Sequence, residues 1–141
     1  MVLGIFSTFT CCVMIKQGSK EADKDEFDEF AVEKPTLLMI HGFGAAGVMF
    51  WPLFKPLLEH FRIVTVDLLG FGGSSRVNIS EETYSDQAAM DAYVLGWLSR
   101  WLEKCTQLGY LPSKFNVHGH SYGGYISSLF ACAHPERIEA L

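Results

Sequence analysis

The sequence predicts an α/β fold whose sheet is mainly parallel and flanked by helices, on three observations. Short apolar runs at residues 36–40, 61–66 and 114–118 have the length and composition of buried strands. A segment with helical spacing or with small residues follows each run, and glycine-rich or polar turns separate the segments. The order strand, helix, strand, helix, strand, helix is typical of a parallel sheet built with right-handed crossovers.

Composition limits the size and the partners of the protein. The 141 residues are 49% hydrophobic, enough for one modest core, and carry a net charge of -5 without a basic patch, which argues against nucleic acid as a partner. The four cysteines show neither metal-ligand nor disulfide spacing, so we expect reduced thiols, no metal and a cytoplasmic location. A complete domain of this class often needs roughly 200–250 residues, so we expect only part of one.

The first 34 residues divide into an apolar segment and an acidic linker. Residues 2–15 have four interpretations: a first β-strand, a membrane-surface anchor with Cys11 and Cys12 as acylation sites, a signal peptide, or an uncertain chain start. The composition favours the strand and the anchor about equally over secretion, so membrane contact through residues 2–15 is one expectation. Residues 16–34 lack the glycine and distal glutamate of a calcium loop and are predicted to be a solvated linker.

The main unit is predicted to span residues 35–141. After the strand at 36–40 and a tight loop at 41–44, apolar spacing predicts a helix over 49–60. Pro52 fits the first turn of this helix, whereas Pro56 lies deeper and is expected to kink it.

A second strand at 61–66 leads into a glycine-rich turn at 67–76 and a long helix at about 84–103. One face of this helix carries large apolar side chains spaced three or four residues apart, which predicts core packing. These residues are Met90, Tyr93, Val94, Trp97, Leu98 and Trp101.

The third strand, at 114–118, ends in a G-x-S-x-G motif at residues 119–123, before a helix over 124–133. A serine on a sharp strand-to-helix turn occupies strained backbone, so its neighbours must be small. Gly119 and Gly123 meet that need. The turn lifts the Ser121 hydroxyl out of the sheet, and the helix N-terminus behind it favours negative charge on a reacting oxygen.

Three motifs in order give a resemblance to the α/β-hydrolase family: residues 37–44 (LLMIHGFG), 64–75 (VTVDLLGFGGSS) and 119–123 (GHSYG). The resemblance covers residues 35–141 and the front half of that fold, ending after the helix that follows the serine. It is nearest to the lysophospholipase and N-acyl-phospholipid lipase branch. The resemblance therefore implies an esterase or lipase acting on a carboxylic ester or acyl-lipid substrate, without a cofactor.

The resemblance also implies the site. Ser121 is the expected nucleophile, and the backbone N–H groups of Phe43 and Tyr122 are the expected oxyanion-hole donors. The residues expected to shape the site without reacting are His41, Gly42, Asp67, Gly119, His120 and Gly123.

The chain is expected to depart from the family by lacking the acid and the histidine of the catalytic triad. In the family the acid and the histidine follow the serine, but only His134 follows Ser121 here, at the end of the next helix. Glu136 and Glu139 are equally poor candidates for the acid. Residues 137–141 resemble the approach to a further strand, so the chain is interpreted as the front half of a hydrolase.

Two functions remain open on this evidence. One is a serine hydrolase that is incomplete as given; the other is a catalytically silent fragment that binds a lipid surface or a protein through exposed core. Haloalkane or epoxide chemistry is a weaker third possibility, because those branches of the family place aspartate where Ser121 stands.

Overall fold

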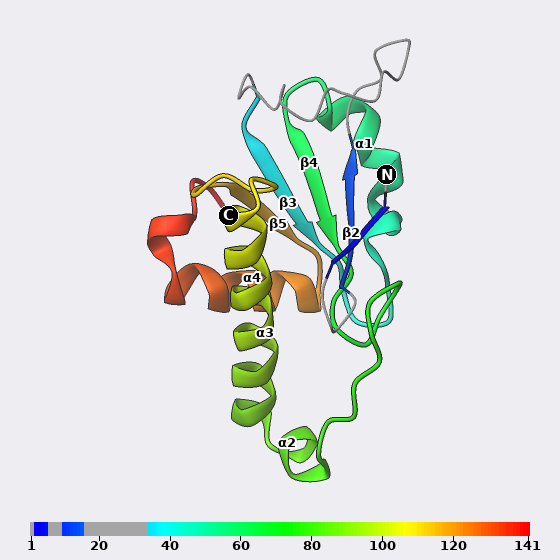
Figure 1. Ribbon diagram of the computed structural model, residues 1–141, viewed down its shortest axis with the longest axis vertical. Coiled ribbons are helices and arrows are strands. Elements are labelled where there is room, and N and C mark those ends of the chain that lie inside the picture. Colours follow the sequence, from blue (N-terminus) through cyan, green and yellow to red (C-terminus); the bar gives the residue numbers. More distant parts are fainter. Residues whose placement is uncertain (1, 6–9, 16–33) are drawn as a thin grey trace.

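A computed structural model describes residues 2–5, 10–15 and 34–141 of the protein (Figure 1). Its centre is a five-stranded sheet with the strand order β1-β2-β4-β3-β5. The strands are β1 (Val2–Ile5), β2 (Thr10–Ile15), β3 (Thr36–Ile40), β4 (Arg62–Val66) and β5 (Asn116–Gly119).

The strands β4, β3 and β5 form the parallel part of this sheet. Leu38 of β3 lies opposite Val64 of β4 on one side and Val117 of β5 on the other, both in parallel register. All five residues of β3 are buried, as expected for a strand covered on both faces. The predicted α/β class with a mainly parallel sheet is thus confirmed.

The apolar run at 2–15 forms two strands, β1 and β2, which pair antiparallel with each other. β2 also pairs antiparallel with β4, where Met14 lies opposite Val64. The strand interpretation of this run therefore matches the backbone, but the prediction of one strand is wrong, because the run is divided between two. Its use as a membrane anchor stays a prediction, and the acidic linker, apart from Lys34, lies outside the described residues.

Helices cover both faces of the sheet. They are η1 (Gly47–Phe50), α1 (Trp51–Leu57), α2 (Glu81–Ser85), α3 (Gln87–Gln107), α4 (Tyr122–Ala133) and η2 (Pro135–Arg137). Leu38 and Ile40 point to the face packed by α3 and α4, whereas Leu37 and Met39 pack with the residues of η1 and α1 on the other. This alternation along β3 follows the two-residue period of a strand.

The long helix predicted over 84–103 is two helices. α2 begins at Ser80, whose hydroxyl accepts a hydrogen bond from the Thr83 N–H at 3.2 Å. Asp86 then adopts an extended backbone, and its carboxylate accepts hydrogen bonds from the N–H groups of Ala88 and Ala89 at 2.8 and 3.1 Å. This N-cap starts α3, so the prediction failed because a capping aspartate interrupted an otherwise helical pattern.

The apolar stripe of α3 forms the main core, as predicted. Val94, Trp97, Leu98 and Trp101 are buried against the sheet and α4, and Met90 and Tyr93 pack at the margin. Cys105 continues this face, and burial raises the pKa of its thiol to about 12, so it behaves as a small apolar core residue.

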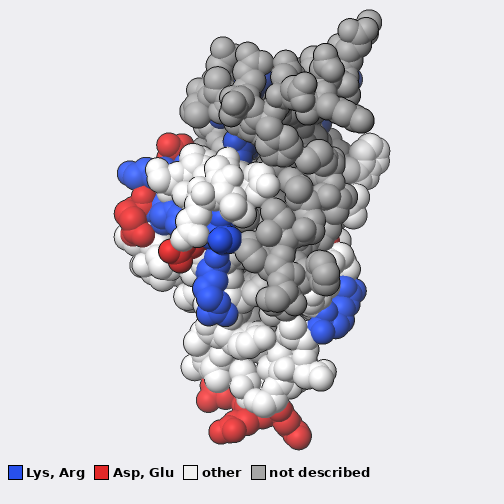
Figure 2. All heavy atoms as spheres, viewed as in Figure 1, with Lys and Arg blue, Asp and Glu red and all other residues white. Residues whose placement is uncertain are grey.

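Charge is unevenly spread over the surface. Acidic side chains gather at the tip formed by α2 (Figure 2), which carries Glu81 and Glu82 in its first turn. Within the described part of the chain, no helix is long and apolar enough to cross a membrane.

Candidate active site

The candidate site lies where β3, β4 and β5 end, since parallel strands bring their following loops to one edge of the sheet (Figure 1). Three loops meet there: residues 41–46 after β3, residues 67–76 after β4, and the turn at residues 120–121 between β5 and α4. Each carries one of the three sequence motifs described above.

Ser121 sits on a strained turn. Its φ of 55° and ψ of -121° make it the one non-glycine residue with a positive φ in the described ranges. A Cβ atom added to Gly119 would lie 2.5 Å from the Gly123 carbonyl oxygen, and one added to Gly123 would lie 2.2 Å from the Ile40 carbonyl oxygen. The turn therefore presses α4 so close to β5 at Gly119, and to β3 at Gly123, that neither position admits a side chain.

The loop after β3 touches this turn directly. A Cβ atom on Gly42 would lie 3.0 Å from Ser121 Cβ and 3.2 Å from His120 Nδ1, so the backbone of Gly42 runs beside the serine. The side chain of Phe43 is 77% exposed, and its ring packs edge-on against Phe71 at 5.1 Å between centroids. The two expected oxyanion-hole donors, Phe43 and Tyr122, are the residues that follow Gly42 and Ser121 in these two touching segments.

His41 joins two of the loops. Its buried ring donates from Nδ1 to the Gly42 carbonyl at 2.7 Å and accepts at Nε2 from the Leu68 N–H at 2.9 Å. This pairing places the proton on Nδ1 of a neutral imidazole. Both nitrogens are occupied, so the ring holds the loop and has no free nitrogen for Ser121.

Asp67 organises the loop after β4. Its carboxylate accepts hydrogen bonds from the Gly47 N–H at 2.6 Å and the Gly73 N–H at 2.8 Å. The carboxylate also fills the space beside Gly72, where a Cβ atom would lie 2.2 Å from Asp67 Oδ2 and φ is +50°. The aspartate therefore links the start of η1 to its own loop and occupies the position of a side chain that Gly72 lacks.

Replacing Asp67 with alanine is expected to lower the free energy of unfolding by about 1.5–3 kcal/mol, because each N–H group loses a charged acceptor. Urea denaturation followed by circular dichroism measures this loss. Asp67→Asn keeps one carbonyl acceptor and should fall between wild type and Asp67→Ala. An Asp67→Ala protein within about 0.5 kcal/mol of wild type would show that water replaces the carboxylate at no cost.

No histidine forms a hydrogen bond with the Ser121 hydroxyl in the part of the chain that the structure describes. All five histidines of the sequence fall within residues 34–141, and the Ser121 hydroxyl has no hydrogen-bond partner among the described residues. The ring of His118 packs edge-on against Phe50, with centroids 5.6 Å apart, and His60 lies between α1 and β4. His120 lies against Gly42 as described above.

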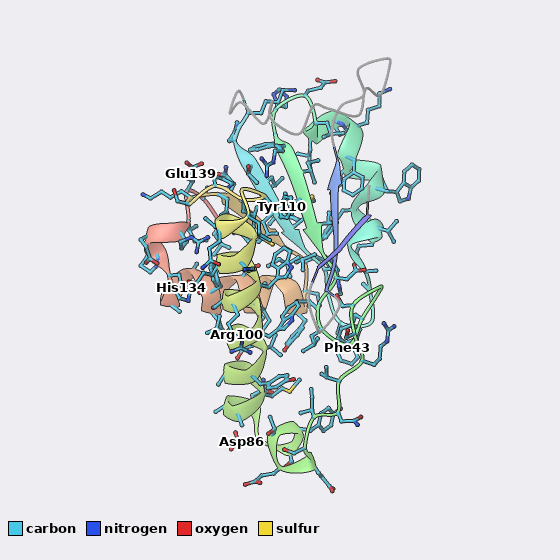
Figure 3. The ribbon with its side chains drawn as sticks, in the orientation of Figure 1. Phe43, Asp86, Arg100, Tyr110, His134 and Glu139 are labelled. Carbon is cyan, nitrogen blue, oxygen red and sulfur yellow. The ribbon has the colours of Figure 1, made fainter. Side chains whose placement is uncertain are left out.

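His134 lies at the far end of α4 from the serine turn (Figure 3). Twelve residues of helix separate the two, which corresponds to about 18 Å. Its Nε2 lies 3.2 Å from Ser99 Oγ, and its Nδ1 lies 3.7 Å from a carboxylate oxygen of Glu136. The structure thus separates His134 and Glu136 from Ser121.

A hydrogen bond between α3 and α4, which no sequence pattern predicted, lies close to the serine turn. The Tyr125 hydroxyl donates to an oxygen of Asp91 at 2.5 Å, which joins the first turns of α3 and α4. Tyr122 stacks on Tyr125 with centroids 6.2 Å apart. Burial, with the nearby Asp91 carboxylate, raises the pKa of the Tyr122 hydroxyl. The spacing of the tyrosines hints at the stack, but no local pattern identifies Asp91 as the partner.

Comparison with known proteins establishes the family. Residues 35–141 match the alpha/beta hydrolase fold family, so the chain belongs to it. The 1-acylglycerol-3-phosphate O-acyltransferase of Arabidopsis thaliana is 36% identical over 107 residues, which make up 76% of this chain and 24% of that protein. The (lyso)-N-acylphosphatidylethanolamine lipase of Bos taurus is 34% identical over 110 residues, 77% of this chain and 29% of that protein.

Solved structures agree on the fold. The thioesterase domain from the curacin biosynthetic pathway superposes with a TM-score of 0.69 at 23% identity, covering 99% of this chain and 43% of that one. The chain therefore spans about a quarter of the length of the curated relatives it matches, and under half of that solved structure.

Proposed function

We propose that the chain carries the nucleophile and the oxyanion hole of a serine hydrolase that acts on carboxylic esters, with acyl lipids as the substrate class. The observation that carries this proposal is the position of Ser121. It stands on a strained turn at the start of α4, with the Gly42 backbone against its Cβ atom. Strained backbone of this kind clusters at active sites because it holds a reacting group in place.

The chemistry follows from that placement. The Ser121 oxygen attacks the ester carbonyl carbon while its proton passes to a base, and the carbonyl oxygen becomes an oxyanion. The N–H groups of Phe43 and Tyr122 and the N-terminus of α4 stabilise this charge. Collapse of the tetrahedral intermediate releases the alcohol and leaves an acyl-enzyme, which water then hydrolyses to a carboxylic acid. The described residues supply no base, so the proposal assigns that group to sequence outside them.

The substrate class is supported by the relatives. The Arabidopsis relative is named for acyl transfer to a lysophospholipid, and the Bos taurus relative for cleavage of an N-acylated phospholipid. The exposed ring of Phe43 offers an apolar surface in the loop that contacts Ser121 through Gly42, which suits an acyl chain. Contact of residues 2–15 with a membrane surface, and a cytoplasmic location, are parts of the same proposal.

Labelling with a fluorophosphonate tests the nucleophile. Because the described residues supply no base, the labelling is done with imidazole added to act as one, and we then expect the label on Ser121 and its complete loss in Ser121→Ala. Ser128→Ala is the matched control, because Ser128 is an exposed serine of the same helix whose hydroxyl donates to the Gly124 carbonyl at 3.0 Å. The label should be mapped by mass spectrometry of tryptic peptides. Label that persists in Ser121→Ala would refute the assignment.

A catalytically silent binding module is the second candidate, and one observation favours it: the Ser121 hydroxyl has no hydrogen-bond partner in the described part of the chain. A folded 141-residue chain that takes no label even with imidazole present would support this candidate. Its partner would be a lipid surface or a protein, which flotation with phospholipid vesicles distinguishes.

A further inference from the structure

Asp91 of α3 and Tyr125 of α4 share a hydrogen bond that the reaction steps at Ser121 do not use. The two helices pack against each other (Figure 1). The Tyr125 hydroxyl donates to Asp91 Oδ2 at 2.5 Å, and the other carboxylate oxygen, Oδ1, accepts from Gln87 Nε2 at 2.7 Å. The hydrogen bond to the carboxylate raises the pKa of the Tyr125 hydroxyl, so the hydroxyl keeps its proton and continues to donate. The carboxylate is thus held by Gln87 from its own helix and by Tyr125 from α4.

The backbone of Tyr125 reaches the serine turn. Its N–H group donates to the Ser121 carbonyl oxygen at 3.1 Å. This carbonyl belongs to the same peptide unit as the Tyr122 N–H group. Because a peptide unit is planar and trans, a hydrogen bond that fixes the direction of its carbonyl also fixes the direction of its N–H group. Tyr125 therefore bears on the N–H group that is expected to donate to the oxyanion.

The tyrosine rings add a second link between the same two residues. The Tyr122 ring stacks on the Tyr125 ring, with 6.2 Å between centroids and 28° between planes. The Tyr125 ring is itself tied to Asp91 through its hydroxyl. Tyr122 is consequently joined to α3 both through the backbone and through the side chain of Tyr125.

The start of α4 needs restraints of this kind. Ser121 has a φ of 55°, and such a conformation persists only where the surrounding structure over-determines it. α4 also begins without a side-chain N-cap, because the Ser121 hydroxyl makes no capping hydrogen bond. The close approach of Gly123 to the Ile40 carbonyl restrains the turn from the side of β3. The hydrogen bond from Tyr125 to Asp91 restrains it from the side of α3.

We propose that Asp91 and Tyr125 are positioning residues for the reaction at Ser121, which act through the Ser121–Tyr122 peptide unit to aim the Tyr122 N–H group at the oxyanion. The proposal rests on the function proposed above, since that reaction forms the oxyanion. Loss of the hydrogen bond leaves the serine hydroxyl in place and changes only how firmly the donor is held. The Tyr125 side chain is 43% exposed, so its hydroxyl contributes little to folding and much more to the rate.

Rates of fluorophosphonate labelling test the pair, with imidazole held at one concentration as the base. Tyr125→Phe keeps the ring stack and loses the hydroxyl, whereas Asp91→Ala loses the acceptor. Each should label Ser121 roughly tenfold more slowly than wild type, which is part of the loss caused by removing a whole oxyanion donor. Asp91→Asn keeps an oxygen that can accept from the tyrosine and should restore a rate close to that of wild type. The double variant Asp91→Ala, Tyr125→Phe should be no slower than either single variant, because both changes remove the same hydrogen bond.

Tyr84→Phe and Glu103→Ala are the matched controls. Tyr84 is an exposed tyrosine of α2, and Glu103 of α3 accepts a hydrogen bond from Gln107 as Asp91 does from Gln87. Both variants should label at the wild-type rate. A merely structural role of the pair would lower the midpoint of urea denaturation and leave the labelling rate of the folded protein unchanged, and that result would overturn the proposal. Single effects that multiply in the double variant would overturn it as well.

The Tyr122 amide separates this proposal from the hydrolase itself. The residual dipolar coupling of the Tyr122 N–H bond, referenced to those of Ile126 and Phe130 in the same helix, reports the direction of that bond. We expect the coupling to change in Asp91→Ala and to stay constant in Glu103→Ala. Wild-type protein that takes no label would refute the serine hydrolase, and a changed coupling would then still support positioning by the pair. An unchanged coupling in Asp91→Ala would overturn the positioning in either case.

Discussion

Gly123→Ala is expected to destabilise the protein by at least about 3 kcal/mol, the upper end of what overpacking costs in cores. The added Cβ atom would lie 2.2 Å from the Ile40 carbonyl oxygen and 2.5 Å from the His41 carbonyl oxygen. Both are backbone atoms of the segment that leads into the candidate site, so neither can move without shifting β3 or α4. Urea denaturation followed by circular dichroism would measure the loss.

Gly96→Ala is the matched control for this prediction. Gly96 also lies inside a helix, but its added Cβ atom would meet only the Arg100 Nη1 atom, at 3.3 Å, at the end of a flexible side chain. Alanine should therefore raise the free energy of unfolding by up to about 1 kcal/mol through its higher helix propensity. Equal effects at the two positions would mean that close approach of α4 to β3 does not limit stability.

The elements predicted well are those whose pattern is local. The apolar run of β3 and the stripe of α3 need only their own residues to be recognised, because burial on both faces and a 3.6-residue period are visible in sequence. The break between α2 and α3 at Asp86 was missed because one aspartate lowers the overall helix propensity of a long helical pattern only slightly. The division of residues 2–15 into two strands was missed for a different reason, since the segment contains no proline, asparagine or aspartate to mark a turn.

The features of the candidate site also divide into those that a local sequence pattern predicts and those that it does not. The position of Ser121 and of its glycine neighbours follows from a motif of five residues. The contact of Gly42 with the serine could be expected only by resemblance, because it joins segments far apart in the chain. The hydrogen bond from Leu68 to His41 and the one from Tyr125 to Asp91 have no local signal at all. Such contacts depend on how the loops and helices pack.

Phe115→Ala is expected to lower the free energy of unfolding by about 3–5 kcal/mol, the usual cost of removing a buried phenylalanine ring. The ring is fully buried and stacks on Phe130 with centroids 6.4 Å apart. It also lies under the Arg137 guanidinium, 5.4 Å from the ring centre, so its loss removes one of the contacts that hold residues 137–140 beside Phe115 and β5. Hydrogen exchange should show faster exchange of the Glu139 amide, which donates to the Phe115 carbonyl.

Phe115→Leu separates the two roles of the ring. Leucine restores most of the buried volume and should recover most of the stability, but it offers no aromatic face to Arg137, an interaction of about 0.5–1 kcal/mol. If the Glu139 amide of Phe115→Leu exchanges as fast as that of Phe115→Ala, the aromatic face fixes the edge of the sheet. If it exchanges as slowly as in wild type, core packing alone is sufficient. In that case the hydrogen bonds of Arg137 to Ser113 and Thr106 hold the edge without help from the ring.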